Sequence, residues 1–227
     1  MTPLVLLHGA LGSKKQFEVL KAELDADFEV YTLNFEGHGG TPSLHEFSID
    51  LFTENLIAFL KENNLKSVNI FGYSMGGYVA LNLALKKPEL VDQIITLGTK
   101  FDWSAEAVAK ELKMLNPDKI EEKVPKFAAK LKQDHSPMDW KEMMRKTAAM
   151  MQRMGEGQRL ELHQLAQIQH NVMTGLGTED TMVTEAESKQ VSDLLQNASF
   201  IALPEVPHPI DKIEAKTLLT FIKSSLS

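Results

Sequence analysis

Short apolar runs alternate with helical stretches along most of this chain of 227 residues. Continuous apolar runs of this length are typical of strands covered on both faces, and parallel strands need helical crossovers between them. The runs that we predict to be strands are 4–8, 28–33, 67–71, 93–97, 170–175 and 198–203. The helices that we predict between them are 13–25, 50–63, 75–87, 184–195 and 210–224. The alternation therefore predicts an α/β fold with a mainly parallel sheet flanked by helices.

The alternation is interrupted by residues 101–166, which contain helical stretches and no convincing strand. Three prolines divide this segment into about four helices. Because it lies between the fourth and fifth strands, we expect it at the carboxyl edge of the sheet, where ligands bind in open α/β folds. We therefore predict a helical cap over 101–166 on a core formed by 1–100 and 167–227.

Composition narrows the class of protein. The net charge of −7 argues against a nucleic-acid partner, which would favour a basic face. No run of 18 apolar residues is present, so we expect no membrane span, and the apolar run after Met1 is too short for a secretory signal. The absence of cysteine fits a reducing compartment. We expect a cytoplasmic monomer or homodimer that acts on a small molecule.

Charge and methionine are both concentrated in the middle of the chain. Residues 100–166 contain 13 Lys and Arg against 11 Asp and Glu, a net charge of +2, so the remainder carries −9. Salt-bridged helix faces explain this distribution, and a mildly positive cap over a site for acidic substrates is the alternative. The methionines of this segment, and Trp103 and Trp140, either line an adaptable acyl pocket or pack the cap's own helices. The methionines in question are Met138, Met143, Met144, Met150, Met151 and Met154.

Residues 72–77, Gly-Tyr-Ser-Met-Gly-Gly, match the G-x-S-x-G pattern of a nucleophile elbow. In such a turn a strand bends sharply into a helix with a serine at its tip, and the glycines leave room where the two elements meet. The pattern alone is weak evidence. Here it lies between a predicted strand that ends at Phe71 and an apolar helix that begins at Met75. We therefore predict that Ser74 is a catalytic nucleophile.

A serine hydroxyl needs a neighbouring base to take its proton. Of the seven histidines, His208 lies in a loop between the last predicted strand and the final helix, where it can reach the carboxyl edge of the sheet. We predict His208 as the base. A third group must orient the imidazole, and Asp180 follows the fifth strand in a suitable loop. Asp102, just after the fourth strand, and Glu179 are the alternatives for this acid.

The oxyanion that forms during acyl transfer needs hydrogen-bond donors. The backbone N–H of Met75, directly after the nucleophile, is one candidate. The loop that follows the first strand supplies the other, for which we predict the N–H of Ala10. Gly9 and Gly12 in this loop also fit the simpler role of shaping a turn between a strand and a helix.

Five short motifs, in this order, resemble those of the α/β-hydrolase family. They are Leu6-Leu7-His8-Gly9, Gly37-His38-Gly39, residues 72–77, Gly177-x-x-Asp180-x-x-Val183 and His208. The resemblance covers nearly the whole chain outside 101–166. It implies the α/β-hydrolase fold and a catalytic triad in the order Ser74, Asp180, His208. Family members usually begin with two further strands, so we expect a trimmed sheet of six parallel strands. A glycine commonly precedes the histidine, whereas Pro207 and Pro209 flank it here.

The predicted triad implies a serine hydrolase that cleaves a carboxylic ester or thioester through an acyl-serine intermediate, without a metal or cofactor. This chain has a serine at the elbow. By the resemblance, the dehalogenases and epoxide hydrolases of the family have an aspartate at that position, so the serine argues against those two activities. Two alternatives remain open. One is an enzyme similar to the lyase of menaquinone biosynthesis or to hydrolases that cleave carbon–carbon bonds. The other is a ligand receptor that keeps the triad but turns over slowly.

Overall fold

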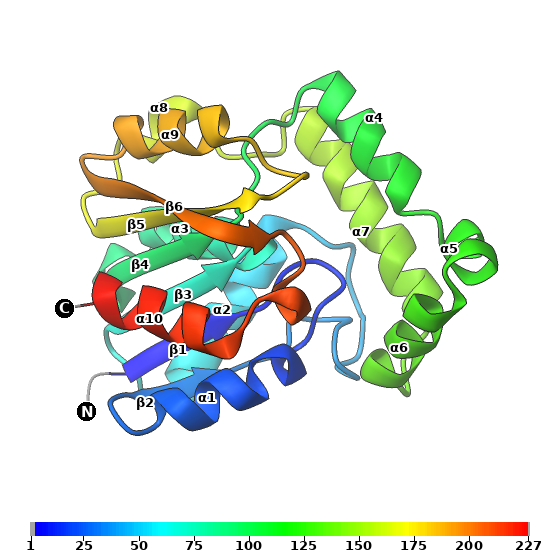
Figure 1. Cartoon of the computed structure of the whole chain (residues 1–227), viewed down its shortest axis with the longest axis horizontal. Coiled ribbons are helices and arrows are strands. Elements are labelled where there is room, and N and C mark those ends of the chain that lie inside the picture. Colours follow the sequence, from blue (N-terminus) through cyan, green and yellow to red (C-terminus); the bar gives the residue numbers. More distant parts are fainter. Residues whose placement is uncertain (1–2, 227) are drawn as a thin grey trace.

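The computed structural model describes residues 3–226. Its centre is a six-stranded sheet in which all neighbouring strands are parallel (Figure 1). The strands are β1 (Pro3–Leu7), β2 (Glu29–Thr32), β3 (Val68–Tyr73), β4 (Val91–Leu97), β5 (Asn171–Glu179) and β6 (Asn197–Pro207). Across the sheet their order is β2-β1-β3-β4-β5-β6. The prediction of six parallel strands is confirmed.

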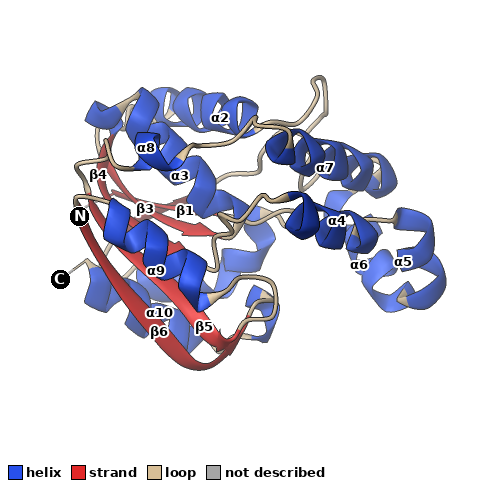
Figure 2. Ribbon diagram, turned by 90° about the horizontal axis from the view of Figure 1, so that it is seen from above, coloured by secondary structure: helices blue, strands red, loops and turns tan. Residues whose placement is uncertain are grey.

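Helices cover both faces of the sheet. On one face lie α1 (Glu18–Leu24), preceded by the 3-10 turn η1 (Lys14–Phe17), and α10 (Ala215–Ser225). On the other face lie α2 (Ile49–Glu62), α3 (Met75–Lys86), α8 (Leu162–Leu165) and α9 (Glu185–Leu194) (Figures 1 and 2). The remaining 3-10 turns among the described residues are η2 (Pro88–Leu90) and η3 (Ile210–Lys212). Within residues 3–226, no helix is long and apolar enough to cross a bilayer.

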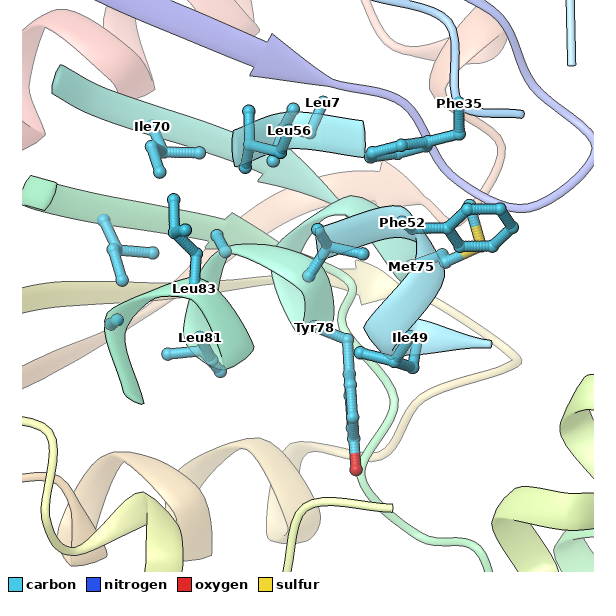
Figure 3. Packing of buried hydrophobic residues seen from close by; sticks show 14 of the residues in the cluster. Leu7, Phe35, Ile49, Phe52, Leu56, Ile70, Met75, Tyr78, Leu81 and Leu83 are labelled. Carbon is cyan, nitrogen blue, oxygen red and sulfur yellow. The ribbon is translucent and has the colours of Figure 1, made fainter. Parts of the chain in front are cut away.

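The core consists of two apolar layers, one on each face of the sheet. Successive residues of a strand point to opposite faces, so Leu4 and Leu6 pack toward α1 and α10 while Val5 and Leu7 pack toward α2 and α3. Figure 3 shows part of the second layer, formed by side chains of the sheet, α2 and α3. Because α3 is covered on all sides, ten of its 12 residues are buried, as its continuous apolar sequence predicted.

Five helices lie between β4 and β5 in the chain, of which α8 packs on the core. The other four are α4 (Ala105–Met114), α5 (Pro117–Lys123), α6 (Pro125–His135) and α7 (Trp140–Gly155). We call them the inserted helices. Proline occupies the first turn of α5 and of α6, where its missing N–H needs no partner. The side chains of Ser104, Asn116 and Asp139 cap α4, α5 and α7. The inserted helices lie beside the carboxyl ends of the strands (Figures 1 and 2).

Candidate active site

Ser74 lies in the turn between β3 and α3, with its backbone in the left-handed region at φ 51° and ψ −115°. A residue with a β-carbon is strained in such a conformation. The turn is tight, because a β-carbon on Gly72 would lie 2.4 Å from the Cα of Gly77. One on Gly76 would lie 2.3 Å from the carbonyl oxygen of Leu7 in β1. The glycines of the motif therefore allow the strand and the helix to meet.

The end of β4 holds this strained residue in place. The N–H of Ser74 donates to the carbonyl of Leu97 at 2.8 Å, and the hydroxyl of Thr99 donates to the carbonyl of Ser74 at 3.0 Å. Both backbone polar groups of Ser74 are thus bonded, which leaves its side chain as the part that is free to react.

His208 and Asp180 form a buried pair, with 2.7 Å between Nδ1 of the imidazole and Oδ2 of the carboxylate. The other carboxylate oxygen, Oδ1, accepts the N–H groups of Met182 and Val183 at 2.8 and 2.9 Å. Burial raises the pKa of Asp180, but the hydrogen bonds from His208 and from these two N–H groups outweigh it and lower the pKa overall. Asp180 is therefore a carboxylate, and a donated Nδ1–H leaves Nε2 of His208 as an acceptor.

The two other carboxylates considered as orienting acids do not contact His208. Asp102 is exposed, and its Oδ1 accepts the N–H of Ser104 at 2.9 Å. Glu179 is exposed at the end of β5. Among the three candidates, Asp180 is the residue that the fold brings to His208.

Tyr73 connects the loop of His208 to the elbow. Its hydroxyl donates to the carbonyl of His208 at 2.9 Å, and the two rings lie 5.6 Å apart between centroids. Burial raises the pKa of Tyr73, which keeps the hydroxyl protonated as a donor. Because Tyr73 directly precedes Ser74, one strand end positions both the serine and the histidine loop, although two prolines flank the histidine.

Gly98 is a residue of this site that the sequence interpretation missed. It follows β4 with φ 61°, and a β-carbon there would lie 3.2 Å from Oδ2 of Asp180 and 3.3 Å from the imidazole of His208. A side chain at this position would therefore be strained and would crowd the histidine–carboxylate pair. The one sequence signal that could have indicated Gly98 is a glycine directly after a strand that ends at the carboxyl edge of the sheet.

Ser74 and His208 line one cavity between the core and the inserted helices. The space between its side chains totals about 460 Å³, partly open to solvent, and much of it is too narrow for a whole water molecule. The cavity is largely apolar and is lined by Ala10, Ile49, Ser74, Met75, Tyr78, Lys100, Trp103, Glu111, Met150, Met151, Met154, Met182, Val183 and His208. Three of these residues, Ile49 of α2 and Met75 and Tyr78 of α3, are labelled in Figure 3.

The two predicted oxyanion donors belong to residues of this cavity. Ala10 lies in the loop after β1 and Met75 is the first residue of α3. In the turns and loops of residues 3–226, neither N–H donates a backbone hydrogen bond. Gly9 also approaches the elbow, because a β-carbon there would lie 3.2 Å from Cβ of Ser74. Gly9 can therefore shape the turn between β1 and the following helix while the same loop also presents the N–H of Ala10.

The methionines divide between the two roles that the sequence left open. Met150, Met151 and Met154 of α7 line the cavity, whereas Met144 packs against Trp140 within the inserted helices. The two tryptophans divide in the same way, because Trp103 lines the cavity and Trp140 packs within the inserted helices.

Three buried histidines, which the sequence interpretation did not group, lie behind the loop of Ala10. The ring of His38 lies 5.1 Å from His8 and 5.9 Å from His135 between centroids. His135, from α6, bridges two loops of the core: its Nδ1 accepts the N–H of Gly39 at 2.9 Å and its Nε2 lies 3.0 Å from the carbonyl of Leu11. One side chain of the inserted helices therefore holds the loop that carries Ala10. In residues 3–226, no group of three ligating side chains is arranged to hold a metal ion.

Two basic residues of α7 bind polar groups of the core. Lys146 donates to the hydroxyl of Ser43 and the carbonyl of His45 at 2.8 and 3.0 Å, and Arg153 donates to the carbonyl of Phe47 at 2.7 Å. These contacts attach α7 to the loop before α2. Two of the positive charges of the segment therefore bind the core rather than face the cavity.

Residues 2–171 match the family model described as the alpha/beta hydrolase fold. Because this match covers most of the chain, the chain belongs to the α/β-hydrolase family, as its motifs indicated. The match includes Ser74 and ends before Asp180 and His208.

Two curated relatives and one solved structure illustrate what the chain is similar to. It is 36% identical over 90 residues to an ethanol acetyltransferase of Hanseniaspora uvarum, a match that covers 39% of this chain and 27% of that protein. It is 34% identical over 98 residues to the sn-1-specific diacylglycerol lipase ABHD11 of Danio rerio, covering 42% of this chain and 31% of that protein. The matched region thus spans about a third or less of either relative. NosK from Streptomyces actuosus shares the fold with a TM-score of 0.84 at 18% identity, over 99% of this chain and 96% of that one.

Proposed function

We propose that this protein is a serine hydrolase that cleaves a carboxylic ester or thioester of a small substrate through an acyl-serine intermediate. Ser74 is the nucleophile, His208 the general base and Asp180 the group that orients His208. The backbone N–H groups of Ala10 and Met75 bind the oxyanion. The observation that carries the proposal is the buried pair of Asp180 and His208 beside the cavity that also contains Ser74.

The reaction has two steps. The hydroxyl of Ser74 attacks the carbonyl carbon while Nε2 of His208 takes its proton, and the leaving alcohol or thiol departs with that proton. Water, activated in the same way, then attacks the acyl-serine and releases the acid. In both steps the carboxylate of Asp180 stabilises the imidazolium that forms on His208.

The narrow cavity favours a short or slender acyl group. Three of its methionines come from α7, and Trp103 and Glu111 come from the start of the inserted segment. We propose that residues 101–166 act as a cap whose side chains select the acyl group, on a core of 1–100 and 167–227. Methionine side chains are flexible and adapt to chains of different shape.

A second candidate reaction transfers the same acyl group to an alcohol. The similarity to a relative named ethanol acetyltransferase favours including it. The acyl-serine intermediate would be shared, and only the acceptor would change from water to alcohol. Adding ethanol to the ester assay and measuring the ethyl ester formed distinguishes the two acceptors.

The alternative of a mildly positive cap over a site for acidic substrates, and with it a reaction like that of the lyase of menaquinone biosynthesis, has less support from the cavity. Apart from His208, Lys100 is the one basic residue that lines the cavity, and Glu111 lies beside it. The basic residues of α7 described above bind carbonyl oxygens of the core instead. The structure offers no observation that favours a receptor, and the ester assay tests that alternative directly.

The decisive test is the hydrolysis of p-nitrophenyl acetate by the wild-type protein and by Ser74→Ala. We expect the variant to lose on the order of 10⁴-fold or more in kcat, because the nucleophile is absent. Ser199→Ala, an exposed serine in β6, is the matched control and should retain wild-type activity. A Ser74→Ala protein that keeps a tenth of the wild-type turnover would rule out the acyl-serine mechanism. A wild-type protein with almost no turnover on esters of any length would favour the receptor.

A further inference from the structure

The cavity beside Ser74 contains a group of polar side chains away from the nucleophile. Lys100, after β4, and Glu111, in α4, form an ion pair with 3.4 Å between Nζ and Oε1. Their side chains are 14% and 3% exposed, and both residues line the otherwise apolar cavity. Charged groups so deeply buried are rare unless their hydrogen bonds are satisfied.

The hydrogen bonds of this group are incomplete. Nζ of Lys100 donates to the carbonyl of Met182 at 3.0 Å, which fixes the ammonium at the wall of the cavity. Oε1 of Glu111 is buried and accepts no hydrogen bond, and Nε1 of the buried Trp103 donates none of ordinary geometry. The hydroxyl of Tyr78, which accepts the N–H of Leu160 at 2.8 Å, also lies near the indole N–H of Trp103, but that approach lacks the geometry of a hydrogen bond. The cavity therefore presents an unused acceptor and an unused donor from residues that line the same space.

The charges of these residues restrict what can bind to them. A carboxylate or phosphate would be repelled by Glu111, and an ammonium group would be repelled by Lys100. A neutral group that donates to Glu111 and accepts from Lys100 or Trp103 would complete the hydrogen bonds without adding charge. A hydroxyl group does both, and it is small enough for a narrow cavity.

We infer that this polar group is a substrate subsite, and that the preferred substrate carries a hydroxyl group on its acyl chain. The inference rests on the proposed hydrolysis at Ser74 and names its substrate class: esters of short hydroxy acids. The apolar methionines accommodate the carbon chain, and Glu111, Lys100 and Trp103 bind its hydroxyl. An acyl chain that ends in a methyl group would leave Oε1 of Glu111 with only the 3.4 Å ion pair to Lys100 and no hydrogen bond.

The inference is tested with p-nitrophenyl esters whose acyl chains, of graded length, end in either a hydroxyl or a methyl group. At the best length, we expect kcat/KM of the wild-type protein to be at least about tenfold higher for the hydroxyl-ended ester, since unpaired buried polar groups penalise the analogue. The double variant Lys100→Met, Glu111→Leu removes both charges at similar volume and should prefer the methyl-ended ester. The matched control, Lys189→Met with Glu185→Leu, removes an exposed ion pair of α9 and should keep the wild-type preference.

A second variant keeps the test decisive if the double variant fails to fold. Trp103→Phe removes the indole N–H and retains an aromatic ring, and it should reduce the preference for the hydroxyl-ended ester. Trp140→Phe is its control, because Trp140 is buried among the inserted helices and does not line the cavity. A wild-type protein that prefers the methyl-ended ester at every length would overturn the inference. So would a preference that survives in both cavity variants.

Binding to Ser74→Ala separates this inference from the proposed function. Titration calorimetry with the same pairs of esters measures the subsite without turnover. Tighter binding of the hydroxyl-ended ester by a protein whose wild-type form hydrolyses neither would support the subsite and reject the hydrolase. Hydrolysis of both esters without a preference would support the hydrolase and reject the subsite.

Discussion

Two strained backbone positions lie at the elbow and in the neighbouring loop of the cavity. Of the four non-glycine residues with positive φ in the described chain, Ser74 and Leu11 lie at the elbow and in the loop of Ala10. Such conformations cost of order 1–3 kcal/mol each and persist only where surrounding contacts fix them. Those contacts are the hydrogen bonds of Ser74 to Leu97 and Thr99, and the contact between Leu11 and His135. For these two strained residues, the side chain of Ser74 and the N–H next to Leu11 are proposed to meet the substrate.

The orienting carboxylate gives a prediction at the scale of one residue. Asp180→Asn should lower kcat by roughly 10⁴-fold, because an amide favours the wrong tautomer of the His208 imidazole. Asp102→Asn should leave kcat unchanged, because Asp102 is exposed and bonds to Ser104. Steady-state hydrolysis of p-nitrophenyl acetate measures both, with circular dichroism as the check on folding. The opposite ranking would assign the acid to the end of β4.

At the scale of elements, periodicity predicted the strands better at their starts than at their ends. The fifth and sixth strands were predicted to end at 175 and 203, whereas β5 and β6 continue to Glu179 and Pro207. Only half of the added residues are exposed, they include a glycine and two prolines, and the pairing shifts register after Gly177, so neither hydrophobicity nor alternation marks the extension. The helix predicted at 13–25 is divided into η1 and α1. The short α8 within 101–166 packs on the core rather than with the inserted helices.

Local motifs were sufficient to predict the candidate triad. They did not predict contacts between segments that are distant in the sequence. The elbow and the Asp180 loop are encoded within a few residues each, and their positions after strands bring them to one edge. The bridge from His135 to Leu11 and Gly39 joins residues 124 and 96 positions apart. The ion pair of Lys100 with Glu111 likewise depends on how α4 packs, which places Glu111 beside Lys100 after the end of β4. No periodicity or spacing in one sequence predicts such pairs.

His135 gives a prediction at the scale of elements, because it joins α6 to two loops of the core. His135→Phe keeps an aromatic ring but leaves the N–H of Gly39 and the carbonyl of Leu11 without these partners. Because both groups are only partly buried, we expect a loss of about 1 kcal/mol in the free energy of unfolding for each one left unpaired. We also expect a lower kcat, because the loop of Ala10 loses its support. Urea denaturation and ester hydrolysis measure the two effects. His163→Phe, in α8, is the control, and equal effects in both variants would contradict the bridge.

At the scale of the whole molecule, the inserted helices and the core share one apolar cluster. Met143, Met150 and Met154 of α7 belong to the same cluster as Ile49 and Tyr78 of the core. The inserted helices are therefore attached by apolar packing as well as by hydrogen bonds, and the cavity lies along this boundary. Access for a bulky acyl group requires some of these contacts to open.

The three buried histidines make the stability of the whole molecule depend on pH. Burial lowers the pKa of His8 to about 4, and burial also lowers the pKa values of His38 and His135. All three are neutral in the folded state, while in the unfolded chain they take up protons below about pH 6.5. Stability from these groups is therefore complete above pH 6.5 and is lost as the pH falls toward the lowered folded-state values. Asp180, whose pKa is lowered from 3.8, loses its contribution only at still lower pH.

Each histidine that stays neutral should contribute a slope approaching about 1.4 kcal/mol per pH unit below pH 6.5. The free energy of unfolding, from urea titrations, should thus be constant near neutral pH and fall steeply between about pH 6.5 and pH 5. Protonation of Nδ1 of His135 would remove the acceptor for the N–H of Gly39, so this contact between α6 and the core persists only while the folded state keeps His135 neutral. His38→Leu removes one of the three groups and should reduce the slope by up to about 1.4 kcal/mol per pH unit. His163→Gln changes an exposed histidine of α8 and serves as the control, which should keep the wild-type slope. A wild-type stability that does not change between pH 7 and pH 5 would mean that these histidines are not held neutral by the fold.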